Sequence, residues 1–289
     1  MLADLLPHRP PRFYAYRMRS NDRCYTGTVK LRGGYRRRIT IWRRNHPPRC
    51  PIGWSTGPPD FLGVGCQKAG TSWWYALLAQ HPQISNLVRP KELHFAMKLR
   101  EDPAAAETYY RHFPRKPGTI AGEFTPSYIL PPGPALLRSA APNARIVVML
   151  RDPIDRLESA ITMDARRRRV FTLEIIAGQE RRSRYAELLE YVFRYYPPAS
   201  VLVLQYERCV ADTLGEVART YGFLGIDPGF VPAGYDRPVN KTTTAKRRLS
   251  DGERAELVER LWPDLCRLPE LVPDLDLDLW NTSMVAHSS

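Results

Sequence analysis

Short apolar runs mark the strands of a buried sheet. FLGVGC at 61–66, ARIVVML at 144–150 and VLVLQY at 201–206 are apolar almost throughout. Continuous apolar runs are typical of strands that are covered on both faces, as in a parallel sheet. The β-branched run at 144–150 is the strongest and suits the centre of the sheet. A weaker strand is predicted at 119–123, before the turn TPSY.

Helical segments are predicted between and after these strands. The first should be capped by Thr71 or Ser72 and stopped by His81-Pro82, and Pro153 should open another. Strands that alternate with helices predict an α/β fold with three layers, α/β/α, around a central parallel sheet. The predicted helices cover residues 71–80, 104–113, 134–141, the segment from Pro153, 185–195, 212–224 and 250–262.

Charge divides the chain into two parts. The net charge is +13, and residues 1–50 hold thirteen Lys and Arg against two Asp. We therefore predict a basic arm and linker at 1–58, with a single main domain at 59–289. The arm could be solvated, could form a small hairpin, or could contact a membrane surface or another anion. No segment resembles a specific nucleic-acid-binding module.

Composition also indicates a compartment. No apolar run approaches the roughly 20 residues of a membrane span, and the first residues lack a secretory pattern. The five cysteines are scattered and odd in number, which argues against a disulfide framework or a zinc site. The sequence therefore predicts a reduced, cytoplasmic protein, and it leaves the oligomeric state open.

The stretch GVGCQKAGTSWW (63–74) has the form of a phosphate-binding loop. A strand, a glycine turn and a helix N-terminus together form an anion site. The template of P-loop nucleotide triphosphatases places a lysine directly after Gly70, but Thr71 stands there and the lysine is Lys68. The fold is thus P-loop-like with a displaced lysine, or the segment is simply a tight turn before a capped helix.

The stretch IVVMLRDPIDRLESA (146–160) carries a second candidate anion site. Arg151 follows the strongest strand, at the edge where ligands bind open α/β sheets, and Ser159 lies about two helical turns further on. An arginine fork with a hydroxyl suits a phosphate monoester. The alternative is a structural salt bridge between Arg151 and Asp152 or Asp155.

Together these segments resemble the sulfotransferase superfamily, over roughly residues 60–281. GCQKAGTSWW is similar to its 5′-phosphosulfate loop, and LRDPIDRLESA to its 3′-phosphate motif. RPKELHF (89–95) and GEFTPSY (122–128) resemble segments of heparan-sulfate-type carbohydrate sulfotransferases and bacterial relatives. VNKTTTAKRRLS and PDLDLDLW also resemble bacterial members.

The resemblance implies a donor, 3′-phosphoadenosine 5′-phosphosulfate (PAPS), with adenosine 3′,5′-bisphosphate (PAP) as the product and no metal requirement. It implies Glu92 as the base that deprotonates an acceptor, with Lys68 at the bridging oxygen and His94 as an alternative base or an acceptor ligand. The acceptor would be a carbohydrate, a glycolipid or another small molecule. The implied donor-binding residues are Lys68, Ala69, Gly70, Thr71, Ser72, Trp73, Arg151, Ser159, Lys246, Arg247 and Arg248.

The chain departs from the family pattern near the acceptor. Phe124 stands where heparan-type relatives have the lysine of E-K-T-P, and Ala96 replaces an aromatic residue after His94-Phe95. Glu123 is retained and is expected to hydrogen-bond in the cleft. These changes put the acceptor class in doubt and leave the donor motifs intact.

Two other function classes are compatible with parts of the sequence. A P-loop kinase or NTPase would need an acidic Mg²⁺ ligand after a strand, and only Asp152 is available. A non-catalytic protein that binds nucleotides or polyanions would account for the charge. The two-motif combination favours the sulfotransferase.

Overall fold

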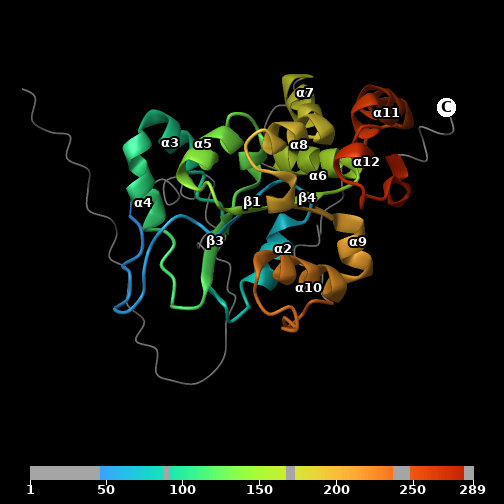
Figure 1. The fold of residues 1–289 in the computed structure, drawn as a ribbon. Coiled ribbons are helices and arrows are strands. Elements are labelled where there is room, and N and C mark those ends of the chain that lie inside the picture. The colour runs from blue at the N-terminus through green and yellow to red at the C-terminus, as the bar shows by residue number, and fades with distance from the viewer. Residues whose placement is uncertain (1–45, 88–90, 167–172, 237–247, 283–289) are drawn as a thin grey trace, which may run out of the picture.

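A computed structural model describes residues 46–87, 91–166, 173–236 and 248–282 (Figure 1). Its centre is a parallel sheet whose strands lie in the order β2-β3-β1-β4-β5. The strands are β1 (Phe61–Gly65), β2 (Ile84–Leu87), β3 (Ile120–Phe124), β4 (Arg145–Leu150) and β5 (Val201–Gln205). The predicted strands are therefore confirmed, and β2 was missed because ISNL carries little apolar signal.

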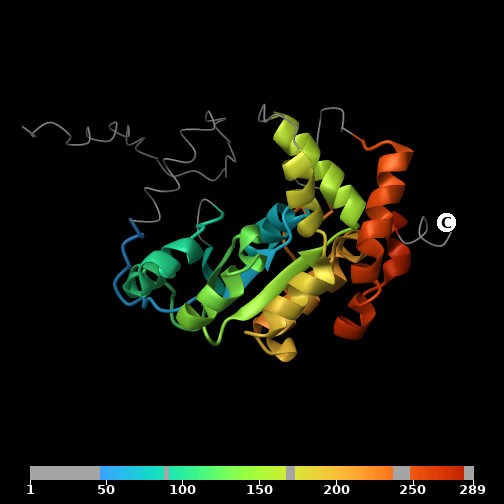
Figure 2. The ribbon, with the colours of Figure 1, turned by 90° about the horizontal axis from the view of Figure 1, so that it is seen from above.

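Helices cover both faces of the sheet, which confirms the predicted three-layer α/β/α fold. In Figures 1 and 2, α2, α9 and α10 lie on one face, and α5, α6 and α8 lie on the other. The helices are α2 (Thr71–Leu78), α3 (Ala96–Glu101), α4 (Ala106–Tyr110), α5 (Gly133–Ala140), α6 (Pro153–Arg166), α7 (Leu173–Arg181), α8 (Tyr185–Phe193), α9 (Tyr206–Ala211), α10 (Thr213–Leu224), α11 (Asp251–Leu265) and α12 (Leu268–Leu271).

Side chains join the helices across the layers. On one face, Trp74 of α2 donates its Nε1–H to Thr220 of α10 at 3.2 Å. On the other, both carboxylate oxygens of Asp264 in α11 accept backbone N–H groups of Ala186 and Glu187 at the start of α8. Ser250 caps α11 in a capping box with Glu253. These contacts fix the helices that carry the site.

The strand order places the loops that follow β1 and β4 side by side at one edge. From β1 the chain passes to β2 and β3 on one side, then to β4 and β5 on the other, so the order reverses at β1 and β4. Ligands of open α/β sheets bind at the carboxyl edge beside such a switch point. The backbone N–H of Cys66, just after β1, donates to Met149 O of β4 at 2.7 Å, which holds the two loops together.

Part of the predicted arm and the closing basic segment lie outside the described residues. This holds for the hairpin expected before residue 45, and for Lys246 and Arg247. Across the parts of the chain that are described, no helix is both long and apolar enough to span a bilayer.

Candidate active site

The phosphate loop, residues 66–70, ends in a left-handed glycine. Gly70 has φ 96°, and a Cβ there would lie 2.7 Å from the ring of Tyr206. Only glycine combines that φ with so close an approach to a neighbouring ring. Gly70 is the N-cap of α2, and no side chain caps the helix. The predicted capping by Thr71 or Ser72 is therefore wrong, and both residues lie in the first helical turn.

Tyr206 connects the loop to the second motif. Its ring lies 4.9 Å from the Arg151 guanidinium carbon and 6.1 Å from the ring of Trp73. Tyr206 was not predicted, because it stands at the end of a strand and reads as an ordinary apolar position. Trp73 is buried, its Nε1 has no hydrogen-bond partner among the described residues, and its backbone N–H donates to Gly70 O at 2.9 Å.

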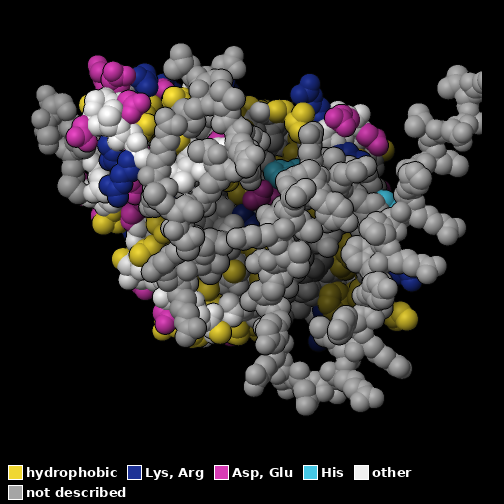
Figure 3. All heavy atoms as spheres, turned by 180° about the vertical axis from the view of Figure 1, so that it is seen from behind, with side chains coloured by type: hydrophobic (Ala, Val, Ile, Leu, Met, Phe, Trp, Pro, Cys, Tyr) yellow, Lys and Arg dark blue, Asp and Glu magenta, His cyan; other side chains and the backbone are white. Residues whose placement is uncertain are grey.

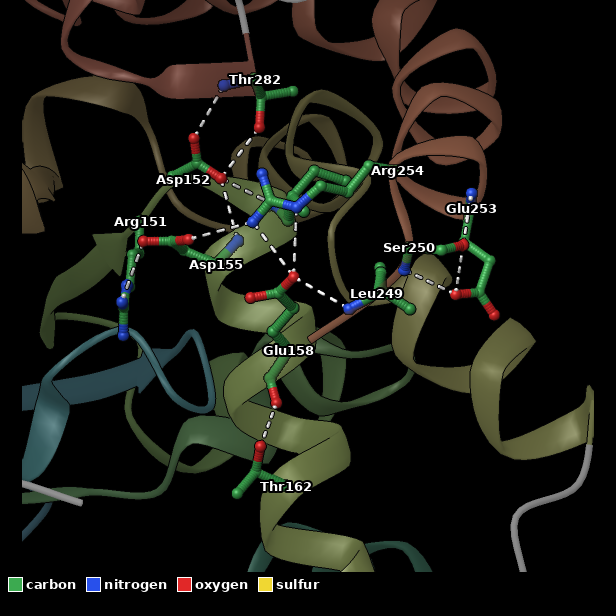
Figure 4. A network of polar contacts seen from close by, with 11 residues as sticks. Arg151, Asp152, Asp155, Glu158, Thr162, Leu249, Ser250, Glu253, Arg254 and Thr282 are labelled. Atoms are coloured by element: carbon green, nitrogen blue, oxygen red, sulfur yellow. Dashed lines mark hydrogen bonds and ion pairs between the residues drawn. The ribbon is translucent and has the colours of Figure 1, made fainter. Parts of the chain in front are cut away.

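Arg151 makes the salt bridge that the sequence offered as an alternative. Its Nη2 lies 3.2 Å from Asp155 Oδ2, one helical turn on (Figure 4). Its Nε is buried and has no partner within the described residues. A buried donor without an acceptor is costly, so this guanidinium retains capacity for an anion. Ser159 lies on the same face of α6, four residues after Asp155.

Helix α11 brings another cation to this face of α6. Arg254 contacts Glu158 Oε1 at 3.1 Å and lies 3.8 Å from Asp155 Oδ1 (Figure 4). Glu158 Oε1 also accepts the backbone N–H of Leu249 at 3.1 Å. This hydrogen bond holds the end of the predicted basic segment against Glu158, the residue that precedes Ser159 in the sequence. Arg248, at that end, is exposed.

Asp152 caps α6. Its Oδ1 accepts the backbone N–H groups of Ile154 and Asp155 and the Thr282 hydroxyl, and its Oδ2 accepts the Thr282 N–H (Figure 4). Asp152 is 3% exposed. A carboxylate with this set of partners serves as an N-cap, and it is not available as the Mg²⁺ ligand that a kinase would need.

The segment 91–95 lies after β2 and reaches the phosphate loop. Lys91 Nζ donates to Thr71 Oγ1 at 3.1 Å, to Ser72 Oγ at 3.3 Å and to Glu92 Oε1 at 3.3 Å. Burial lowers the pKa of Lys91, and the charge of Glu92 partly opposes this. Lys91 was missed as a site residue, although it stands in the KELHF motif, because its reach across to α2 is not visible in the sequence.

Glu92 and His94 lie close together. Glu92 Oε2 is 3.3 Å from His94 Nε2, and His94 Nδ1 lies 3.2 Å from Ser127 Oγ. The segment is not extended, because Glu92 has φ 79° and His94 has φ 53°. Burial raises the pKa of Glu92, but hydrogen bonding to His94 and the nearby charge of Lys91 outweigh it and hold the pKa below its usual value.

The positive φ values single out three residues. Over the described ranges, the non-glycine residues with left-handed φ are Lys68 at 72°, Glu92 and His94. Such conformations cost of order 1–3 kcal/mol and cluster at functional sites. The strained positions coincide with the three residues that the sequence nominated for catalysis.

Glu123 is not in the cleft. It is fully buried and accepts hydrogen bonds from the hydroxyls of Tyr109, Thr125 and Tyr128 and from the backbone N–H of Leu93. Burial raises its pKa, against the opposing effect of these donors. The expected role of Glu123 in the cleft is therefore wrong. Its carboxylate instead anchors the segment 91–95 through the backbone N–H of Leu93.

Phe124 points into the core. It is 1% exposed, and its register partner on β1 is Gly63, where a Cβ would lie 2.2 Å from the Phe124 ring. The ring also packs edge-on against Tyr75 and Phe61. The side chain therefore fills the space that Gly63 leaves and does not face the acceptor.

Metal-binding groups are not clustered here. Among the residues that the structure describes, no three His, Cys, Asp or Glu side chains are grouped so as to hold a metal ion. The four described cysteines are free thiols.

The comparisons with known proteins agree with these motifs. A sulfotransferase domain model matches residues 58–246. Human heparan sulfate glucosamine 3-O-sulfotransferase 6 is 30% identical over 203 residues, which cover 63% of this chain and 58% of that protein. Human heparan sulfate glucosamine 3-O-sulfotransferase 3B1 is 28% identical over 185 residues, or 58% and 46% of the two chains. The chain thus spans about half the length of these curated relatives.

Solved structures extend the likeness to the fold. A sulfotransferase from Alicyclobacillus acidocaldarius superposes with a TM-score of 0.62 at 25% identity, over 76% of this chain and 98% of that one. The sulfotransferase STF9 from Mycobacterium avium superposes with a TM-score of 0.50 at 13% identity, over 84% and 83%, and shares the fold. Because the family model covers the greater part of the chain, the chain belongs to the sulfotransferase family.

Proposed function

We propose that the protein transfers a sulfuryl group from PAPS to a hydroxyl or amine of an acceptor, with Glu92 as the base. The observation that carries this proposal is the strained trio of Lys68, Glu92 and His94, at the carboxyl edge of the sheet. Strain is retained where the fold over-determines it, as at a preorganised site. Structural turns would use glycine at these positions.

The residues that would hold the donor fit its two phosphates. The loop and the first turn of α2 offer backbone N–H groups, the hydroxyls of Thr71 and Ser72, and a positive helix end for the 5′-phosphosulfate. The unpartnered buried Nε of Arg151 suits the 3′-phosphate. When bound, PAPS supplies an activated sulfuryl group with a phosphate as leaving group.

The transfer needs positioning and charge stabilisation more than covalent help, by analogy with phosphoryl transfer. In the proposed step the acceptor oxygen forms a bond to sulfur while the bond from sulfur to the bridging oxygen breaks. The acceptor proton moves to Glu92 Oε, and PAP leaves. Because the pKa of Glu92 is held low, its carboxylate is ionised and ready to accept that proton at neutral pH.

The acceptor class is proposed from the relatives. Two of them are heparan sulfate glucosamine 3-O-sulfotransferases, so a carbohydrate hydroxyl is the first candidate, followed by a glycolipid or another small molecule. Contact of the basic arm with an anionic surface and a cytoplasmic location remain predictions from the sequence.

Calorimetry separates this proposal from a nucleotide triphosphatase. Wild-type protein should bind PAP tightly and without metal, and should bind ATP with Mg²⁺ weakly. The reverse preference would refute the proposal. In a turnover assay with labelled PAPS, Lys68→Ala should lower the rate about 100- to 1000-fold, the usual loss for one preorganised donor at a developing negative charge.

A further inference from the structure

Lys91 is a cation that the two donor motifs do not include. Its side chain is 13% exposed, and its ammonium group has three N–H donors. Three acceptors lie within hydrogen-bond distance: Thr71 Oγ1, Ser72 Oγ and Glu92 Oε1. The side chain of Lys91, which follows β2, thus connects the first turn of α2, next to the phosphate loop, with the proposed base.

These contacts determine where the loop hydroxyls can donate. A hydroxyl that accepts a hydrogen bond from an ammonium group has its own proton left to donate elsewhere. Lys91 therefore orients Thr71 and Ser72 as donors, at the first turn of α2 where an anion is favoured. The same ammonium group favours the ionised form of Glu92, since an opposite charge nearby stabilises a carboxylate.

We propose that Lys91 is a positioning residue that couples the donor to the base, by aiming the Thr71 and Ser72 hydroxyls at the 5′-phosphosulfate and holding the Glu92 carboxylate beside them. This inference rests on the proposed function. Lys91 acts through its three partners, so it should affect the 5′ end of the nucleotide and leave the 3′ end unchanged.

The test compares two nucleotides by calorimetry on the full chain. PAP carries both phosphates, and adenosine 3′-monophosphate lacks the 5′ one. Lys91→Met should weaken PAP binding about 10- to 100-fold, in line with the loss of charge-assisted hydrogen bonds, and leave adenosine 3′-monophosphate unchanged. Lys91→Arg, which keeps the charge, should recover most of the affinity. Lys98→Met is the matched control, because it removes the charge of a nearby lysine whose Nζ lies over the Phe95 ring.

A second readout follows Glu92 directly. In a carbon-13 NMR titration of side-chain carboxyls, assigned with Glu92→Gln, Lys91→Met should raise the pKa of Glu92 and Lys98→Met should not. If a folded Lys91→Met variant keeps both the wild-type affinity for PAP and the lowered pKa of Glu92, the inference is overturned and the proposed function is unaffected. A wild type that does not prefer PAP to adenosine 3′-monophosphate would overturn both.

Discussion

Glu92 and Glu123 are two carboxylates that serve the same segment of chain in opposite surroundings. The side chain of Glu92 is 36% exposed and lies between the side chains of Lys91 and His94. Glu123 is fully buried and is surrounded by neutral donors. The pKa of Glu92 is lowered, whereas burial raises the pKa of Glu123. The difference teaches that exposure and partner charge, more than residue type, separate the proposed base from the anchor.

Replacement of Glu92 should have the largest effect, and on chemistry alone. Glu92→Gln keeps the shape of the side chain but cannot accept the acceptor proton, so turnover of labelled PAPS should fall about 100- to 10,000-fold. The free energy of unfolding should change by less than about 1 kcal/mol, because exposed ion pairs contribute little. PAP binding by calorimetry is the control. Unchanged transfer would remove Glu92 from the role of base.

Replacement of Glu123 should act on stability instead. Glu123→Ala leaves the backbone N–H of Leu93 and three hydroxyls without their acceptor, so the free energy of unfolding should fall by about 3 kcal/mol. Urea denaturation followed by tryptophan fluorescence measures it. If Glu123→Ala were as stable as Glu92→Ala, the distinction between anchor and base would fail.

The two tyrosines on Glu123 sharpen this point at smaller magnitude. Tyr128 donates to Glu123 Oε1 and also accepts the backbone N–H of Phe95 at 2.7 Å, whereas Tyr109 donates to Glu123 Oε1. Tyr128→Phe should cost about 2 kcal/mol, because it leaves a buried N–H unpaired, and Tyr109→Phe about 1 kcal/mol. If urea denaturation shows that both variants lose the same free energy of unfolding, the hydrogen bond from Phe95 N–H to Tyr128 does not stabilise the segment 91–95.

Acidity should affect the two carboxylates in opposite directions. Transfer should persist down to mildly acidic pH and be lost as the pH falls through the lowered pKa of Glu92, below the usual 4.5.

Glu123 has a raised pKa when folded, so its contribution to stability is greatest below 4.5 and is lost as the pH rises from there through the raised value. The stability of wild type relative to Glu123→Gln should therefore decrease over that range, as measured by urea denaturation at several pH values. A relative stability that rises with pH would contradict the raised pKa.

Much of the fold and of the candidate donor site was predictable from local patterns. The strands at 61–66, 144–150 and 201–206 were visible because continuous apolar runs suit a covered parallel sheet. The phosphate loop was visible because glycine at position 70 marks a backbone turn before a helix. The strand Ile84–Leu87 was not visible, because its residues gain their pairing from β3 rather than from their own propensity.

The sequence by itself determined most of the order of strands and helices and the two anion motifs, since each depends on neighbours a few residues apart, whereas the candidate base came from the resemblance to a known family. Only the tertiary structure decided which side chains meet. Lys91 reaches Thr71 across twenty positions, Phe124 fills the space that Gly63 leaves, and the buried Glu123 accepts the backbone N–H of Leu93, next to the proposed base. These roles depend on burial and on partners from other strand ends, and packing alone fixes both.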